Sequence, residues 1–80
     1  MTTRECVANR IIELCAERDM AFNALARVSA VSPSTVKNII NGASRNPGIV
    51  TLKMLCDGLG ITLIEFFDTD AFRSLEQEIR

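Results

Sequence analysis

Small polar side chains and one lysine gather on one side of a predicted helix that begins near Pro33. At 100° per residue, Ser34, Asn38 and Asn41 fall within a sector of about 60°, opposite the apolar residues, and Lys37 lies beside them. Asparagine can form two hydrogen bonds with N6 and N7 of adenine, serine can donate or accept, and lysine can reach O6 and N7 of guanine. The composition of this face therefore suits the reading of base edges in the major groove of duplex DNA.

An ordinary solvated helix face carries the strong helix formers Glu, Lys, Gln and Arg, whereas Ser, Asn and Thr lower helix propensity. Part of the pattern has a local explanation, because Ser34 and Thr35 can cap the helix start and Asn41 can help to end the helix. That explanation leaves Lys37 and Asn38 unaccounted for. We therefore predict that this face contacts a ligand.

The basic residues dominate the middle of the chain, although the whole chain has a net charge of −1. Residues 20–56 contain Arg27, Lys37, Arg45 and Lys53 and no Asp or Glu, whereas residues 57–80 contain six acidic and two basic residues. A cationic segment is typical of a surface that faces phosphates. Four charges also fit an ordinary solvated surface, so the charge pattern supports DNA binding without establishing it.

The segments that position this face are predicted to be helices, because apolar residues recur at intervals of three and four along almost the whole chain. The predicted helices are one from about Arg4 to Arg18, one from Phe22 to about Val28, one from Pro33 to about Asn41, one containing residues 52–59, a short one after Thr62 and a last one over about residues 70–79. No strand pattern occurs. The expected fold class is therefore all-α, a small bundle of five to six helices in one domain spanning residues 1–80.

The start of the third predicted helix has three independent signals. Ser32 is a good N-cap, Pro33 suits the first helical position, and Val31 can pack against Val36 as a hydrophobic staple. Gly42 is expected to end this helix in a left-handed conformation. Its start is the most clearly marked of any element in the sequence.

The end of the chain is less informative. Thr62 and Glu65 form a capping box that starts a short helix. Phe72, Leu75 and Ile79 are spaced to line one face of the last helix. That stripe either covers the bundle or pairs with a second copy of the chain in a homodimer, and the sequence favours neither alternative.

Composition excludes several classes of protein. The chain has no apolar stretch near the roughly 18 residues that a membrane helix needs and no signal peptide, so we expect a soluble cytoplasmic protein. Its three cysteines, Cys6, Cys15 and Cys56, lack metal-ligand spacing, and the sequence has no histidine. We therefore expect buried reduced thiols, with a redox-sensing thiol as the alternative, and neither a metal nor a cofactor.

The middle of the sequence resembles the repressor type of helix-turn-helix found in phage Cro and C1 repressors, the lambda-repressor-like fold. The resemblance covers about Val7 to Phe67, with the motif at about residues 21–41, and it is carried by Leu25-Ala26, Val31-Ser32, Val36, Ile39, Ile40 and Asn41-Gly42. The resemblance implies that the second helix of the motif reads bases, through Pro33, Ser34, Thr35, Lys37 and Asn38. It further implies phosphate contacts at Phe22, Asn41, Ser44, Arg45 and Asn46.

Several positions depart from the family pattern, and two of them, Ala30 and Ala21, lie at the ends of the motif's first helix. Ala30 stands where glycine is usual, and a left-handed alanine there costs on the order of 1 kcal/mol relative to glycine. Ala21 replaces the usual Ser or Thr cap of the second helix, which weakens that helix start by roughly 1 kcal/mol. Any anion bound at this helix end would interact with backbone amides alone.

Two classes of function remain after these exclusions. The first is a sequence-specific transcriptional regulator whose partner is double-stranded DNA. The second is a protein-interaction or antitoxin-like module that uses the same fold, as the acidic last third of the chain indicates. An enzyme with a small-molecule substrate is not expected, because the chain has no His, no Tyr and no phosphate-binding glycine loop after a strand.

Overall fold

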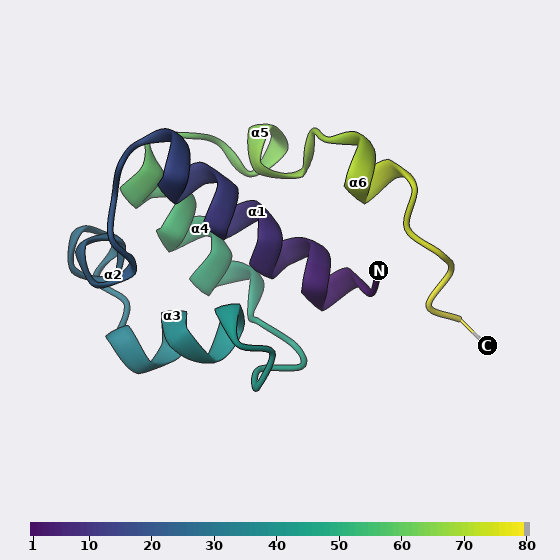
Figure 1. Cartoon of the computed structure of the whole chain (residues 1–80), viewed down its shortest axis with the longest axis horizontal. Coiled ribbons are helices and arrows are strands. Elements are labelled where there is room, and N and C mark those ends of the chain that lie inside the picture. Colours follow the sequence, from purple (N-terminus) through teal and green to yellow (C-terminus); the bar gives the residue numbers. More distant parts are fainter. Residues whose placement is uncertain (80) are drawn as a thin grey trace.

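The computed structural model describes residues 1–79 and contains helices but no strand within them (Figure 1). The helices are α1 (Thr3–Glu17), α2 (Phe22–Ser29), α3 (Pro33–Ile40), α4 (Ile49–Leu59), α5 (Leu63–Phe67) and α6 (Asp70–Arg73). The all-α fold class predicted from apolar spacing is thereby confirmed. None of these helices has both the length and the apolar character that crossing a membrane requires.

One hydrophobic core joins the first five helices. Each of them contributes a fully buried side chain, namely Ile11, Leu25, Val36, Leu55 and Phe66. Helix α2 packs against both α3 and α4, and α3 also packs against α1. Helix α3, which carries the polar face, is therefore held in place by its contacts with both α1 and α2.

The contact between α2 and α4 is unusually close at Gly58. A Cβ atom at this position would lie 2.0 Å from Oγ of Ser29 and 3.2 Å from a methyl group of Val28. Ser29 is itself buried, and its hydroxyl has no hydrogen-bond partner within the described part of the chain. Because Gly58 has no side chain, α2 can approach α4 closely. This contact fixes the position of α2, which leads into α3.

The polypeptide leaves α2 through a left-handed residue, as the resemblance to repressors implied. Ala30 has φ 55° and ψ 34°, and the N–H of Val31 donates to the carbonyl oxygen of Ala26 (3.0 Å). Helix α4 ends in the same way at Gly60, with φ 74°. Alanine pays a steric cost in this conformation that glycine avoids.

Replacing Ala30 with glycine is therefore expected to raise the free energy of unfolding by about 1 kcal/mol. Urea-induced unfolding followed by circular dichroism measures this change. The matched control is Ala24→Gly, inside α2. It is expected to lower the free energy of unfolding by about 1 kcal/mol, because glycine is unfavourable in a helix interior. A loss of stability in the Ala30→Gly variant would contradict the strain assigned to this turn.

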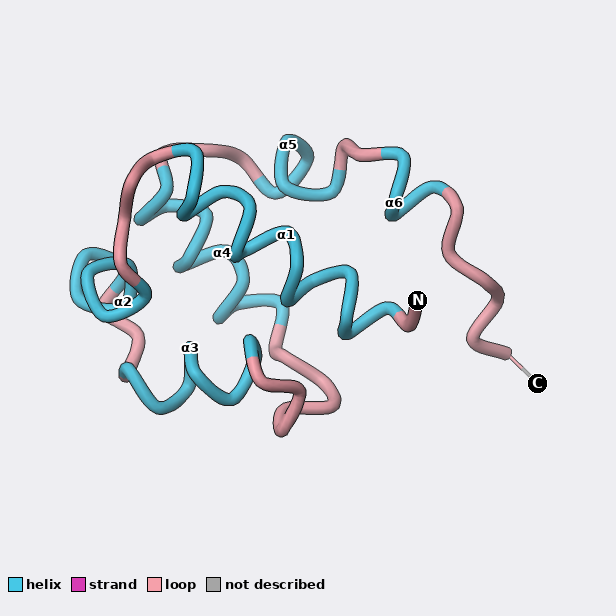
Figure 2. The backbone as a smooth tube through the Cα atoms, viewed as in Figure 1, coloured by secondary structure: helices cyan, strands magenta, loops and turns pink. Residues whose placement is uncertain are grey.

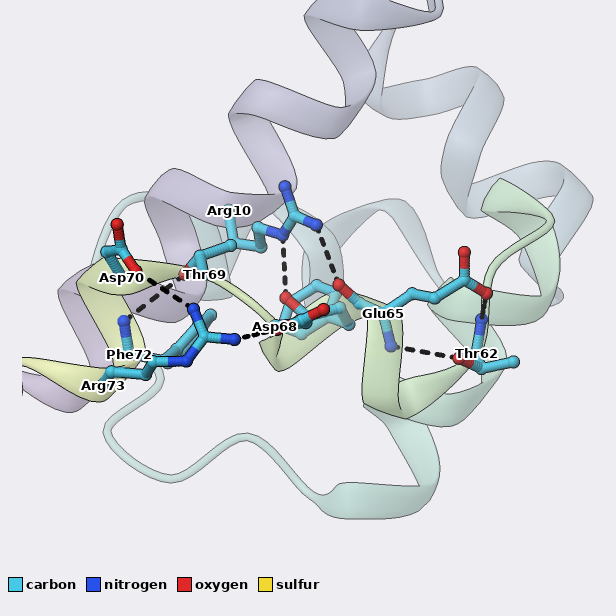
Figure 3. A network of polar contacts seen from close by, with 9 residues as sticks. Arg10, Thr62, Glu65, Asp68, Thr69, Asp70, Phe72 and Arg73 are labelled. Carbon is cyan, nitrogen blue, oxygen red and sulfur yellow. Dashed lines mark hydrogen bonds and ion pairs between the residues drawn. The ribbon is translucent and has the colours of Figure 1, made fainter.

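Helix α5 is anchored to α1 by Arg10 (Figure 3). The Nε atom of Arg10 donates to the carbonyl oxygen of Phe66 (2.7 Å), and its Nη2 atom donates to that of Glu65 (2.9 Å). These bonds supply donors to carbonyl groups in the last turn of α5, where the helix itself supplies few. At the other end of α5, the predicted capping box is present, since Thr62 and Glu65 each accept from the other residue's backbone N–H (Figure 3).

The last helix is much shorter than the sequence predicted. It ends at Arg73 rather than near residue 79, and residues 75–79 contain no helix (Figure 2). A longer helix would place the carboxylates of Glu76 and Glu78 close to the negative end of its dipole, which is unfavourable. Short helices also depend on tertiary packing, and the side chain of Ile79 is 79% exposed and does not pack against the core. The continuous apolar stripe of Phe72, Leu75 and Ile79 therefore does not form.

All three cysteines are free and buried, as the composition predicted. Desolvation by burial raises the pKa of Cys6, Cys15 and Cys56, which favours the protonated thiol at neutral pH. A reactive thiolate needs exposure and a positive environment that burial denies to these side chains. The residues of the described chain contain no cluster of three or more metal-ligating side chains.

Candidate nucleic-acid interface

The boundaries of α3 match the sequence signals. Oγ of Ser32 accepts from the backbone N–H of Thr35 (3.2 Å), and Pro33 occupies the first helical position. Val36 and Ile39 are 1% and 2% exposed. Burial of these two side chains fixes the rotation of α3 and turns its opposite face outward.

The five residues predicted to read bases differ in how exposed their side chains are. Pro33, Ser34, Lys37 and Asn38 are exposed, whereas Thr35 is half-buried. Hydroxyl groups of Ser34 and Thr35 lie 3.1 and 2.9 Å from Oγ of Ser32, so both take part in the cap. The local explanation considered for these two hydroxyl groups is therefore correct in part.

Lys37 and Asn38 differ from the capping residues. Within residues 1–79, neither side chain forms a hydrogen bond or an ion pair. The amide of Asn38 and the ammonium group of Lys37 thus keep all their donors available on the exposed face of α3. These are the two residues that helix capping did not explain.

The loop after α3 is tied back to that helix. The N–H of Ser44 donates to the carbonyl oxygen of Asn38 (2.9 Å), and Oδ1 of Asn41 accepts from the N–H of Ala43 (2.9 Å). Because its oxygen is engaged, Asn41 offers its amide NH₂ group to an anion. Gly42 has φ 83°, which confirms the left-handed helix end expected from the sequence.

Among the residues predicted to contact phosphate, Asn41, Arg45 and Asn46 are exposed and Ser44 is half-buried. Phe22 is the first residue of α2 and is 40% exposed. Ala21 is the N-cap residue of this helix, and no side chain in the described residues caps it. An anion at the start of α2 would therefore meet backbone amides that no side chain caps.

Sequence reasoning missed Arg4. It lines one groove with Asn41 and Gly42, and it lines a second groove with Arg45 and Asn46. Three of the predicted phosphate contacts, Asn41, Arg45 and Asn46, thus line a groove together with a cation from the start of α1. The sequence gives no signal for this placement, because Arg4 lies in a segment of mixed charge and nothing local distinguishes it from Arg10.

The structure also changes the count of free positive charges in the middle segment. Lys53 forms an ion pair with Asp57, one turn along α4. Arg27, Lys37 and Arg45 take part in no ion pair within the described residues. Three cations, rather than the four of residues 20–56, are therefore left unneutralised.

Two helices joined by a left-handed turn, with the second helix exposing polar groups beside a cationic loop, define a helix-turn-helix domain. A model of the Cro/C1-type HTH DNA-binding domain matches residues 10–71. The chain belongs to this family. The resemblance to repressors seen in the sequence, and the fold that it implied, are confirmed.

Three solved structures have a similar fold. The crystal structure of prophage Lp1 protein 11 is 30% identical, with a TM-score of 0.81 over 94% of this chain and all of the other. An HTH_3 family transcriptional regulator from Vibrio cholerae is also 30% identical, with a TM-score of 0.74 over 80% of this chain and 35% of the other. The restriction-modification controller protein C.Esp1396I, 21% identical, has a TM-score of 0.79 over 94% of this chain and 95% of its own.

No similar protein was found among the curated proteins compared with the chain.

Proposed function

We propose that this domain is a sequence-specific regulator of transcription that inserts α3 into the major groove of duplex DNA. The observation that carries the proposal is the exposed face of α3, where Lys37 and Asn38 have no intramolecular partner within the described residues. An amide and an ammonium group placed in this way can form hydrogen bonds with base edges. The similarity to a transcriptional regulator from Vibrio cholerae supports the same role.

Phosphate contacts position such a helix, and the loop after α3 supplies candidates for them. Arg45 is exposed and free of any ion pair in the described chain, and the amide of Asn41 is available as a donor. The N-terminal amides of α2, beginning at Phe22, supply a further set. We expect both sets of groups to contact the DNA backbone beside the groove that α3 enters.

Selection of bound sequences from random duplex DNA tests the proposal directly. A regulator of this kind is expected to enrich one short sequence, and its binding is expected to weaken steeply as salt rises, because DNA releases counterions on binding. A protein-interaction module is expected to retain no DNA at low salt and to enrich no sequence. That result would reject the proposal.

The selected sequence also reports the number of copies bound. A symmetric dimer of helix-turn-helix domains places its two reading helices about 34 Å apart, which requires inverted half-sites. We propose a homodimer as the DNA-bound form. Recovery of a single half-site without an inverted partner, together with a monomer in sedimentation, would contradict this part of the proposal.

Replacing Arg45 with glutamine is expected to weaken binding about equally on selected and random duplexes and to reduce the slope of log affinity against log salt by about 1. Removal of one phosphate contact has this effect because phosphates carry no sequence information. Fluorescence anisotropy titrations at several salt concentrations measure both quantities. Lys53→Gln is the matched control, since Lys53 is already paired with Asp57. If the slope of log affinity against log salt were unchanged in Arg45→Gln, Arg45 would not contact a phosphate.

A further inference from the structure

The C-terminal segment, residues 74–79, follows α6 and is called the tail below. It leaves α6 and passes close to the N-terminus of the chain in the view of Figure 2. The tail, the start of α1 and the loop after α3 line one groove. Its apolar lining includes Val7, Leu52, Phe67 and Leu75, and the charged side chains that line it are Arg4, Arg45, Glu76 and Glu78.

Two contacts hold the tail in this position. Leu75 is half-buried among the apolar residues of the groove. Near the end of the tail, Oγ1 of Thr3 donates to Oε1 of Glu78 (2.6 Å). Helix α6, from which the tail emerges, is braced by Phe72, whose ring centroid lies 4.9 Å from that of Phe67. Both ends of the tail are therefore tied to the body of the domain.

The tail brings negative charge to the place where phosphate is expected. Glu76 and Glu78 line the same groove as Arg4 and Arg45 but form no ion pair with them within residues 1–79. The carboxylates therefore lower the electrostatic potential around these guanidinium groups without neutralising them by contact. A phosphate that approaches Arg45 meets two negative charges in the same groove.

We propose that the tail is an autoinhibitory element that competes with the DNA backbone for the cationic groove. The inference rests on the proposed function, because it concerns affinity for duplex DNA. One exposed hydrogen bond and one half-buried leucine form a weak attachment. Duplex DNA with sufficient affinity for α3 can therefore displace the tail, whereas weak non-specific binding is suppressed.

The test neutralises the tail and measures binding to fluorescently labelled random and selected duplexes. The variant Glu76→Gln with Glu78→Gln is expected to bind about threefold to tenfold more tightly than the unaltered chain at about 0.15 M salt, and the gain is expected to shrink as salt rises. Glu13→Gln with Glu17→Gln is the matched control. It removes the same charge from exposed positions on α1 that do not line the groove. A gain below about twofold is expected for this control, because it changes the net charge and two exposed ion pairs, with Arg10 and Arg18, but no residue of the groove.

A second variant keeps every charge and loosens the tail. Thr3→Val removes the hydroxyl group that holds Glu78, and a gain of about twofold to threefold in affinity is expected. Equal gains in the two glutamine variants, or no gain in the tail variant, would overturn the autoinhibitory role while leaving the proposed function intact. Failure of every variant to bind either duplex at low salt would reject the proposed function and the tail's role with it.

Discussion

Replacing Asn38 with alanine is expected to weaken binding to the selected duplex by about 1 to 3 kcal/mol, a loss of about fivefold to 150-fold, and to change binding to random DNA little. The amide of Asn38 is exposed on α3 and has no partner within the described residues. Its hydrogen bonds to a base edge are therefore lost without compensation, while contacts with phosphate remain.

The readout for this prediction is the ratio of affinities for selected and random duplexes, measured by anisotropy at one salt concentration. Alanine has a higher helix propensity than asparagine, so the variant is expected to fold at least as well as the unaltered chain. Asn9→Ala removes the same group from the exposed surface of α1 and is expected to leave the ratio unchanged. Equal losses on both duplexes would show that Asn38 does not read bases.

Replacing Phe66 with alanine is expected to lower the free energy of unfolding by about 3 to 5 kcal/mol. The ring is fully buried, and its centroid lies 4.9 Å from that of Phe67 and 6.0 Å from that of Phe72. Its removal leaves a cavity where α5 meets the core. Domains of this size are stable by about 4 to 12 kcal/mol, so a large part of the native stability is lost.

Urea-induced unfolding followed by circular dichroism measures this effect. Ile64 lies two residues earlier in α5 and is 81% exposed, which makes Ile64→Ala the matched control. A surface change of that kind is expected to alter stability by no more than about 0.5 kcal/mol. If Phe66→Ala lowered the free energy of unfolding by less than about 1 kcal/mol, the packing of α5 against the core would not contribute to stability as described above.

Much of the domain follows from local chemistry. The cap at Ser32, the proline after it and the apolar spacing through Ile39 placed α3 correctly, because each signal acts within one or two helical turns. The capping box of Thr62 and Glu65 located α5 for the same reason. The face of α3 was likewise predictable, since a buried Val36 determines which residues point outward.

The end of the chain shows where periodicity misleads. Phe72 and Leu75 have helical spacing, yet α6 stops at Arg73. A helix in a small domain is stable when its apolar face packs against the core, and the spacing of residues does not reveal whether core surface is available to cover it. The exposure of Ile79 shows that no such surface lies there.

Sequence alone determined the first five helices, the rotation of α3 and the class of ligand that its polar face suits, because these properties depend on residues within a few positions of one another. Tertiary structure decided which charges remain available. It paired Lys53 with Asp57, brought Arg4 beside the loop of Arg45, and brought the tail into the groove that they line. Electrostatic potential depends on distance in space, and the order of residues in a chain does not give that distance.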